Sequence, residues 1–346
     1  MPYESQIYAE PRFSDHEGRA LWQSISRDLI IQRLLTPSLT ETLIKLGVLT
    51  ILFVAALWLS WFGNSWMEYA VAWIALALLL AQFAFVGHDA GHGSTTRKPA
   101  INRAIGQFSM TLVAGLAFDE WIARHRAHHR FCQDESRDPD MAVAFVASLT
   151  VESKLRKGFL GRLLTRCQFV HIWFLTLLFG HSQRHLSQIA GLCNPRRHRI
   201  DAAMLILHFT LWFGVPCLLL NVPIHAALLA YAIPATLLGP YLAAIFWVNH
   251  IGMPLIRNVE SFSFFEHQIV TSRTITNPPA WDWLFGGLNY QIEHHLFPRV
   301  ASSRLPAVQA IVRRHFALHQ IAYNGVPWHE AVRMIAAHFR QVARAA

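Results

Sequence analysis

The sequence predicts an all-α integral membrane protein with two transmembrane helical hairpins, and its composition and hydrophobic segments both indicate this. The chain has 346 residues, of which 53% are hydrophobic and 15% are charged, whereas a soluble domain carries about 25% charged residues. A helix of about 20 apolar residues crosses a bilayer. We therefore expect four spans, at about 42–63, 67–87, 201–221 and 224–249.

The placement of basic residues predicts the orientation of these spans. The turns 63–66 and 221–223 contain no Lys or Arg, and all thirty lie in residues 1–45, in 88–200 or after residue 250. Basic loops face the cytoplasm. We expect three cytoplasmic parts, namely an N-terminal arm and two segments of a histidine-rich cap, at 1–37, 88–200 and 250–346. The membrane domain as a whole covers 38–346.

The net charge of +9 could indicate a nucleic-acid partner, but the motifs argue against that class. The chain contains no basic recognition helix and no RNA-binding motif, so no nucleic acid is expected. Basic segments beside membrane spans bind anionic headgroups. We expect the positive charge to contact membrane lipids and an acidic redox protein.

Further elements are expected outside the spans. A helix is expected around 17–35, and Ser38 with Glu41 matches a capping box that would begin the first span. Residues 101–118 are moderately apolar but contain Asn, Arg, Gln and Ser, which indicates a helix at the membrane interface. Residues 168–180 are apolar but too short to cross, so we expect a second interfacial helix there.

Seven histidines fall in three short motifs at helical spacing. They are His88 and His92 in HxxxH, His125, His128 and His129 in HxxHH, and His294 and His295 in QxxHH, which begins at Gln291. Residues three and four apart share a helix face, so each motif can direct two or three ligands at one point. His250 ends the fourth span on the same predicted side of the membrane. Seven imidazoles exceed the needs of one four-coordinate ion, which predicts a pair of metals.

The donor types favour iron for this pair. Neutral imidazole suits Fe, Zn, Cu and Ni, but structural zinc sites use Cys and His spacings that are absent here. The four cysteines have no paired spacing and are expected to be reduced and structural. Histidine ligation beside a bilayer gives access to an apolar substrate and to O2, which favours iron.

The histidine motifs lie in three longer stretches that carry a family resemblance. These are GHDAGHGS (87–94), DEWIARHRAHHRF (119–131) followed by Asp138-Pro139-Asp140, and WDWLFGGLNYQIEHHLFP (281–298). In this order and at these separations, residues 38 to 300 resemble the membrane fatty acid desaturase family. The resemblance implies an oxidoreductase with a non-haem di-iron centre, which takes electrons, uses O2 as co-substrate and removes two vicinal hydrogens from an acyl chain.

The resemblance also implies the ligands and the electron source. The iron ligands would be His88, His92, His125, His128, His129, His250, His294 and His295, and no catalytic residue beyond these is expected. Front-end members commonly carry a fused cytochrome b5 domain, for which the residues before the first span leave no room. Electrons are therefore expected from a ferredoxin or a free cytochrome b5 with its reductase. By analogy, this favours a bacterial inner membrane, with the active site facing the cytoplasm.

Gln291 stands where many members of that family have histidine, and this departure resembles acyl-lipid and front-end desaturases. An amide oxygen is a weaker ligand than imidazole, so Gln291 could instead hold a water or a hydrogen bond to a ligand.

Other polar residues have two interpretations each. Gln82 and His208, at membrane depth, could line an acyl tunnel or make interhelical hydrogen bonds. Four carboxylates and His267 could orient ligand imidazoles or balance the metal charge, or they could be ordinary capping and solvated groups; the carboxylates are Asp89, Glu120, Asp138 and Glu293. His181 and His185 repeat the HxxxH spacing, but we place them on a surface or interfacial helix because the coordination sphere is already filled.

The histidine pattern leaves two alternatives to desaturation. A hydroxylase, ketolase, epoxygenase or acetylenase on the same scaffold would share the motifs and differ only in its product. A non-redox membrane zinc protein, either a hydrolase or a receptor, is the alternative of another class.

Overall fold

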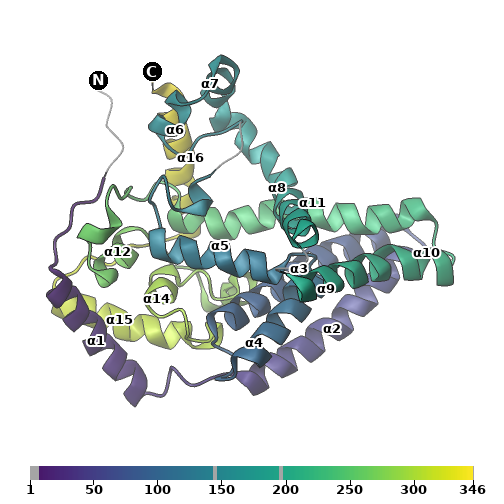
Figure 1. The fold of residues 1–346 in the computed structure, drawn as a ribbon, viewed down its shortest axis with the longest axis horizontal. Helices are drawn as coiled ribbons and strands as arrows, with labels where there is room; N and C mark the ends of the chain where they lie inside the picture. Colours follow the sequence, from purple (N-terminus) through teal and green to yellow (C-terminus); the bar gives the residue numbers. More distant parts are fainter. Residues whose placement is uncertain (1–7, 143–145, 195–197, 346) are drawn as a thin grey trace. The chain divides into compact units, whose positions relative to one another are not determined.

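The computed structural model describes residues 8–142, 146–194 and 198–345, which are mostly helical (Figure 1). The chain divides into two compact units. Unit 1 comprises Met1–Thr36, Arg124–Phe174 and Ala244–Ala346, and unit 2 comprises Pro37–Ala123 and Leu175–Ala243. Three helices contribute residues to both units: α5 (Phe118–Phe131), α8 (Gln168–Cys193) and α11 (Ile224–His250).

Unit 2 contains most of the apolar helical structure. Besides its parts of the shared helices, it consists of α2 (Leu39–Phe62), α3 (Trp66–His92), α4 (Pro99–Gly106), the π-helix η1 (Gln107–Val113), α9 (Arg199–Phe209), the π-helix η3 (Thr210–Gly214) and α10 (Val215–Leu219). Four helical stretches are long and apolar enough to cross a membrane, namely Leu39–Phe62, Trp66–His92, Arg199–Leu219 and Ile224–His250. They are paired as two hairpins, which confirms the predicted fold class and makes the chain a multi-pass membrane protein.

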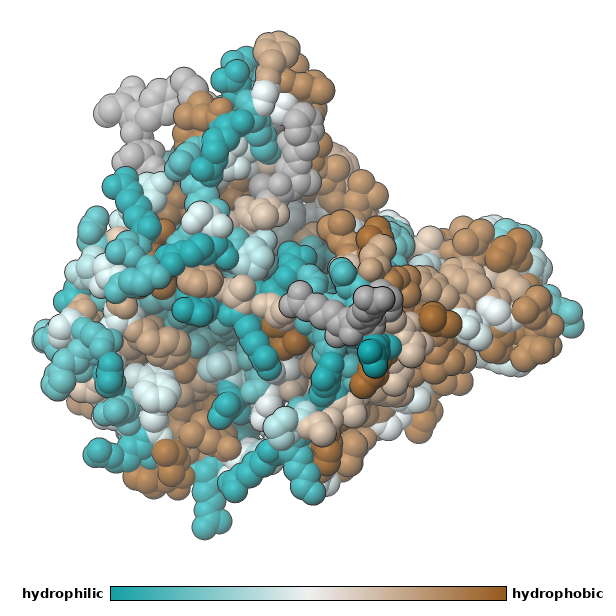
Figure 2. Space-filling model, in the orientation of Figure 1, coloured by the Kyte–Doolittle hydropathy of each residue, from teal (hydrophilic) through white to brown (hydrophobic). Residues whose placement is uncertain are grey.

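The outer surfaces of these helices are apolar, as expected for contact with lipid. Ile51 of α2 is 72% exposed, and Leu218 of α10 is 80% exposed. Figure 2 shows hydrophobic side chains covering the region of α10 at the right of the view. The spans that end in histidines are the more enclosed ones: 61% of the apolar window of α3 and 50% of that of α11 are buried, against 28% for each of the other two spans.

Within unit 2, α8 packs against α11 through two glycines. A Cβ added at Gly239 would lie 2.1 Å from the carbonyl oxygen of Thr176, and one added at Gly180 would lie 2.3 Å from that of Ala235. Small residues let helix backbones approach closely in membranes. The two glycines therefore set how closely α8 and α11 approach.

The structure corrects three local predictions. The helix expected at 168–180 continues to Cys193, because the polar residues after Gly180 find interior partners, such as Thr236 for His181. With α7 (Phe159–Arg166), bent 96° from it, α8 could form a fifth span by length and composition. The helix expected at 101–118 is instead α4 followed by η1.

The predicted capping box at Ser38 is also wrong, because its side chain does not cap α2. A complete capping box instead begins α1 (Asp15–Ile31), where the Ser14 hydroxyl accepts from the N–H of Glu17 and the Glu17 carboxylate accepts from the N–H of Ser14.

Unit 1 is built from shorter elements around one apolar core. Its remaining elements are η2 (Pro139–Met141), α6 (Val151–Leu155), η4 (Val259–Ser261), α12 (Phe264–Val270), β1 (Thr274–Ile275), η5 (Pro279–Trp281), α13 (Asp282–Phe285), α14 (Gln291–Leu296), η6 (Ser302–Arg304), α15 (Leu305–Leu318), β2 (Gly325–Val326) and α16 (Trp328–Arg344). The strands β1 and β2 pair in parallel over two residues.

The N-terminal helix is part of this core. α1 buries Leu21, Ile25 and Leu29 in a cluster with residues of α12, α14 and α15. The Trp22 ring stacks on Phe297 at 5.8 Å, and its indole N–H donates to the carbonyl of Leu296 at 3.0 Å. The N-terminal segment therefore supports α14, which carries the third histidine motif.

Candidate metal centre

Helix α5 presents the second histidine motif to the interior of unit 1. His128 is buried, and its Nδ1 lies 3.0 Å and 3.2 Å from the two carboxylate oxygens of Asp138. Burial alone would lower the pKa of His128, but the charges of Asp138 and Asp140 raise it to about 9. Asp138 thus holds the proton on Nδ1, and Nε2 is the ring nitrogen that a metal would bind by displacing its proton.

His250, the last residue of α11, is oriented by a backbone carbonyl. Its Nδ1 donates to the carbonyl oxygen of Thr271 at 3.0 Å, so its Nε2 carries the lone pair. The buried thiol of Cys132 lies 3.4 Å from the same Nδ1. Burial raises the pKa of Cys132 well above its ordinary value, so the group is a neutral thiol packed against the nitrogen that faces Thr271.

His295 of α14 is oriented by an amide. Its Nδ1 lies 2.8 Å from Oε1 of Gln268, a residue of α12. Its Nε2 is buried and has no hydrogen-bond partner among the described residues. Burial, followed by the neighbouring imidazoles, holds the pKa of His295 well below its ordinary value, so the ring is neutral and its orphaned Nε2 is suited to binding a metal.

These three imidazoles form one compact group. The ring centroids of His128, His250 and His295 are 4.8 to 5.3 Å apart. Together with Cys132, they offer one ligand atom each within 4.8 Å of one another. Imidazoles held at Nδ1 by oxygen acceptors bind iron, zinc and copper through Nε2 once its proton is displaced, so the residues present fit a metal.

A second set of imidazoles lies beside this group in unit 1. The Nε2 of His129 lies 3.1 Å from that of His125 and 3.2 Å from that of His294. The His129 ring also stacks on that of His295, with the centroids 4.2 Å apart. The structure therefore brings six of the eight predicted ligands together within one unit.

Gln291 lies next to a predicted ligand atom. Its Nε2 is 2.8 Å from Nε2 of His250, and its Oε1 accepts from the amide of Asn249 at 3.1 Å. The amide nitrogen, rather than the oxygen, thus faces the site. With Nδ1 of His250 protonated, this N–H donates to the lone pair of His250 Nε2, so a metal bound at that nitrogen would replace the contact.

Two other predicted residues have a supporting position. The Nε2–H of His267 donates to the carbonyl of Cys132 at 2.9 Å. Glu293, fully buried, accepts from the hydroxyls of Thr274 and Tyr323 at 2.8 and 2.7 Å. Glu293 therefore anchors α14 to neighbouring segments, and its hydrogen bonds are not with an imidazole.

The first histidine motif lies in unit 2, at the end of α3. The rings of His88 and His92 are 4.7 Å apart, and His88 also contacts the Trp121 ring at 5.7 Å. The Nδ1 of His88 lies 3.5 Å from the carboxylate of Asp89. The pair thus shares one helix face, as the spacing predicts.

Glu120 lies elsewhere in unit 2. Its carboxylate is 3.9 Å from Nε2 of His198. His198 is not one of the predicted metal ligands. The neighbouring Asp201 accepts from the N–H of Asp119 and from the hydroxyl of Thr111. These carboxylates support the start of α5.

The polar residues at membrane depth have protein neighbours. The Nδ1 of His208 donates to the carbonyl of Leu112 at 2.7 Å, and its Nε2 lies 3.2 Å from the hydroxyl of Tyr231. Interhelical hydrogen bonding, the alternative to a tunnel role, therefore describes His208. Gln82 is fully buried and hydrogen-bonds Tyr241.

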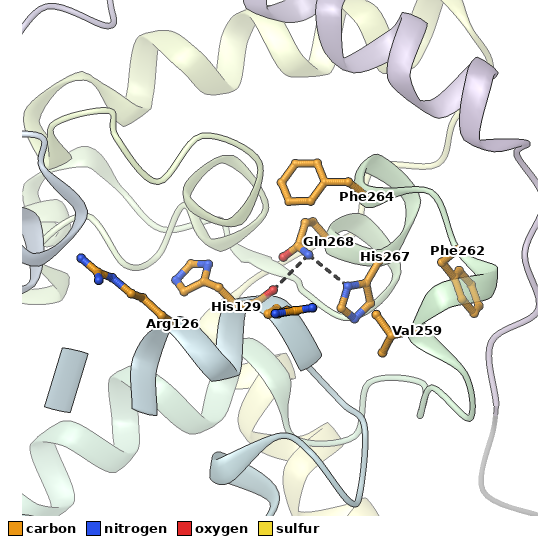
Figure 3. A pocket seen from close by; sticks show the side chains of 8 residues that line it. Arg126, His129, Val259, Phe262, Phe264, His267 and Gln268 are labelled. Carbon is orange, nitrogen blue, oxygen red and sulfur yellow. Dashed lines mark hydrogen bonds between the residues drawn. The ribbon is translucent and has the colours of Figure 1, made fainter. Parts of the chain in front are cut away.

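A cavity of about 420 Å³ adjoins the histidines in unit 1 (Figure 3). It is lined by Arg126, His129, Arg130, Val259, Phe262, Phe264, His267 and Gln268. Figure 3 shows the Gln268 amide between His129 and His267, with a hydrogen bond to each. Sequence reasoning missed Gln268, Thr271 and the placement of Cys132, because their partners lie far away along the chain.

Comparison with known proteins agrees with the family resemblance of the histidine motifs. The family described as fatty acid desaturase matches residues 64–327. The Delta(8)-fatty-acid desaturase 2 of Arabidopsis thaliana is 27% identical over 303 residues, which cover 84% of this chain and 67% of the relative. The acyl-lipid (9-3)-desaturase of Borago officinalis is 26% identical over 287 residues (78% and 62%), and the acyl-lipid (8-3)-desaturase of Rebecca salina is 27% identical over 336 residues (94% and 75%).

The chain therefore spans about two thirds of the length of the first of these relatives. All three come from eukaryotes, so they give no support to the predicted bacterial inner membrane.

Proposed function

The chain belongs to the fatty acid desaturase family, and we propose that it desaturates a fatty acyl chain, with O2 as co-substrate, at a histidine-bound pair of iron ions. Three imidazoles, two of them buried and that of His250 partly buried, carry the proposal. His128, His250 and His295 each have Nδ1 held by an oxygen acceptor, which leaves Nε2 of each ring for a metal. Imidazole donors in a buried, partly apolar setting suit non-haem iron.

We assign the ligands to two sets. One set is His128, His250 and His295, which lie together in unit 1. The other set is the remaining histidines of the three sequence motifs, namely His88, His92, His125, His129 and His294, and this part of the assignment rests on the motifs and the family.

The protein's own groups have defined tasks in this reaction. The bound iron pair supplies the oxidising chemistry that O2 and electrons drive. Asp138, Thr271 and Gln268 keep a proton on Nδ1 of three imidazoles and so hold each ring in one orientation. The buried surroundings of His295, with Nε2 out of contact with solvent, exclude water from the ligand side of the ring.

The substrate and partners follow from the family and from the relatives. We propose an acyl chain carried by a lipid or another acyl carrier, because two of the relatives are named acyl-lipid desaturases. We propose a separate redox protein, a ferredoxin or a free cytochrome b5, as electron donor. The cap would face the cytoplasm, and Gln82 remains a proposed residue of the acyl tunnel.

The proposal can be tested in a host with a simple lipid profile. The full chain, His128→Ala and His329→Ala are expressed, and the fatty acids are compared by mass spectrometry. His329 is exposed and serves as the control. We expect a product lacking two hydrogens with the wild type and the control, and none with His128→Ala.

Three results would contradict parts of the proposal. Unsaturation that persists in His128→Ala would refute the assigned site. A product that gains an oxygen would identify a hydroxylase instead. Purified protein with zinc, without iron and without reductant-dependent O2 consumption would refute the di-iron assignment.

A further inference from the structure

A chain of hydrogen bonds that starts at one backbone carbonyl fixes the protonation pattern around His295. The carbonyl oxygen of Cys132 can only accept, and Nε2 of His267 lies 2.9 Å from it. His267 must therefore carry its proton on Nε2 when neutral, and its Nδ1 becomes an acceptor. Burial lowers the pKa of His267, which keeps the ring neutral.

The acceptor at His267 in turn fixes the amide of Gln268. The Gln268 Nε2 lies 3.1 Å from Nδ1 of His267 and 3.2 Å from the carbonyl oxygen of His129. Both of these neighbours are acceptors, so the NH2 group must face them. A flipped amide would place an oxygen against two acceptors, which the geometry disfavours.

The fixed amide then determines the tautomer of His295. With its NH2 group engaged, Gln268 directs Oε1 to Nδ1 of His295 at 2.8 Å. His295 must donate from Nδ1, so its lone pair lies on the buried Nε2 that has no partner among the described residues. Gln268 is only 1% exposed, so water does not compete for these bonds.

We propose that Gln268 is a positioning residue that sets the tautomer of His295 and links α14 to α5. His267 fixes the orientation of the Gln268 amide by accepting one of its N–H groups. The proposal rests on the metal centre proposed above and deepens it. His128 is held by a carboxylate, His250 by a backbone carbonyl and His295 by a neutral amide. Gln268 hydrogen-bonds both the His129 backbone on α5 and the His295 ring on α14.

The test measures binding of Co²⁺ to the full-length protein purified in detergent, by competition with a chelator and by the visible spectrum of the bound ion. Removing a hydrogen-bond partner of a metal ligand weakens metal affinity by about 10–100-fold. We expect Gln268→Leu to show a loss of this size and an altered spectrum. Gln268→Glu keeps an acceptor for His295 but sets its second oxygen against the two acceptors that hold the Gln268 NH2 group, so its Co²⁺ affinity should also stay below that of the wild type.

A matched control separates positioning from general stability. Gln168 is also fully buried, accepts from the N–H of Ser148 and donates to the carbonyl of Phe339. Gln168→Leu should lower the melting temperature and leave Co²⁺ affinity and the spectrum unchanged.

The outcomes distinguish this proposal from the one it rests on. If His295→Ala loses Co²⁺ while Gln268→Leu binds it as the wild type does, the role of Gln268 is overturned and the metal centre stands. A wild type that binds no Co²⁺ would overturn both proposals.

Discussion

Replacing Asp138 with Asn should weaken the fold, because each carboxylate oxygen of Asp138 accepts a backbone N–H. Oδ1 accepts from Asp140 and Oδ2 from Gln133, both at 2.9 Å, and both oxygens lie within 3.2 Å of Nδ1 of His128. In Asn, one of these oxygens becomes an NH2 group, so a buried N–H faces another donor whichever way the amide turns. An unsatisfied buried N–H costs about 1–3 kcal/mol, and we expect a loss of that size in the free energy of unfolding.

The same substitution should reduce metal binding. The charge that holds His128 is lost, and such changes weaken metal affinity by about 10–100-fold, which is about 1.4–2.8 kcal/mol. Iron content and the melting temperature of the purified protein measure the two effects. Asp15→Asn is the control, because Asp15 is 70% exposed and pairs with Arg19 across one helical turn; such a pair is worth about 0.5 kcal/mol or less. Asp138→Asn with wild-type iron content and melting temperature would refute this reasoning.

Two further predictions concern the fold. Gly239→Ala should destabilise the α8–α11 contact by about 1–3 kcal/mol, because the added Cβ would lie 2.1 Å from the carbonyl oxygen of Thr176. Gly47→Ala is the control: a Cβ there meets nothing within 4 Å, so this variant should stabilise α2 by up to about 1 kcal/mol. Equal melting temperatures for the two variants would contradict this prediction. The hydrogen bond from His315 to Asp28, 2.8 Å long, holds the pKa of Asp28 below its ordinary value. The stabilisation is therefore present above the unfolded carboxyl pKa and is lost as pH falls through the lower folded value. The melting-temperature difference between the wild type and Asp28→Asn should shrink as the pH is lowered through this range, and a constant difference would contradict the assignment.

The sequence by itself determined the spans and the spacing of the histidines, because both depend on local properties of the chain. Length and apolarity define a membrane helix, and the spacing of three and four places His125, His128 and His129 on one face of a helix. Asp138 was also within reach of sequence reasoning, since it follows His128 by only ten residues.

The extent of α8 and the orientation of the imidazoles were decided only by the tertiary structure. α8 continues past residue 180 because polar side chains such as His181 meet partners on α11, and no local pattern specifies those partners. Thr271 and Gln268 lie 21 and 27 residues from the histidines they hold. A hydrogen bond needs an acceptor placed to within a few tenths of an ångström, and only the packing of α5, α11, α12 and α14 in unit 1 sets those positions.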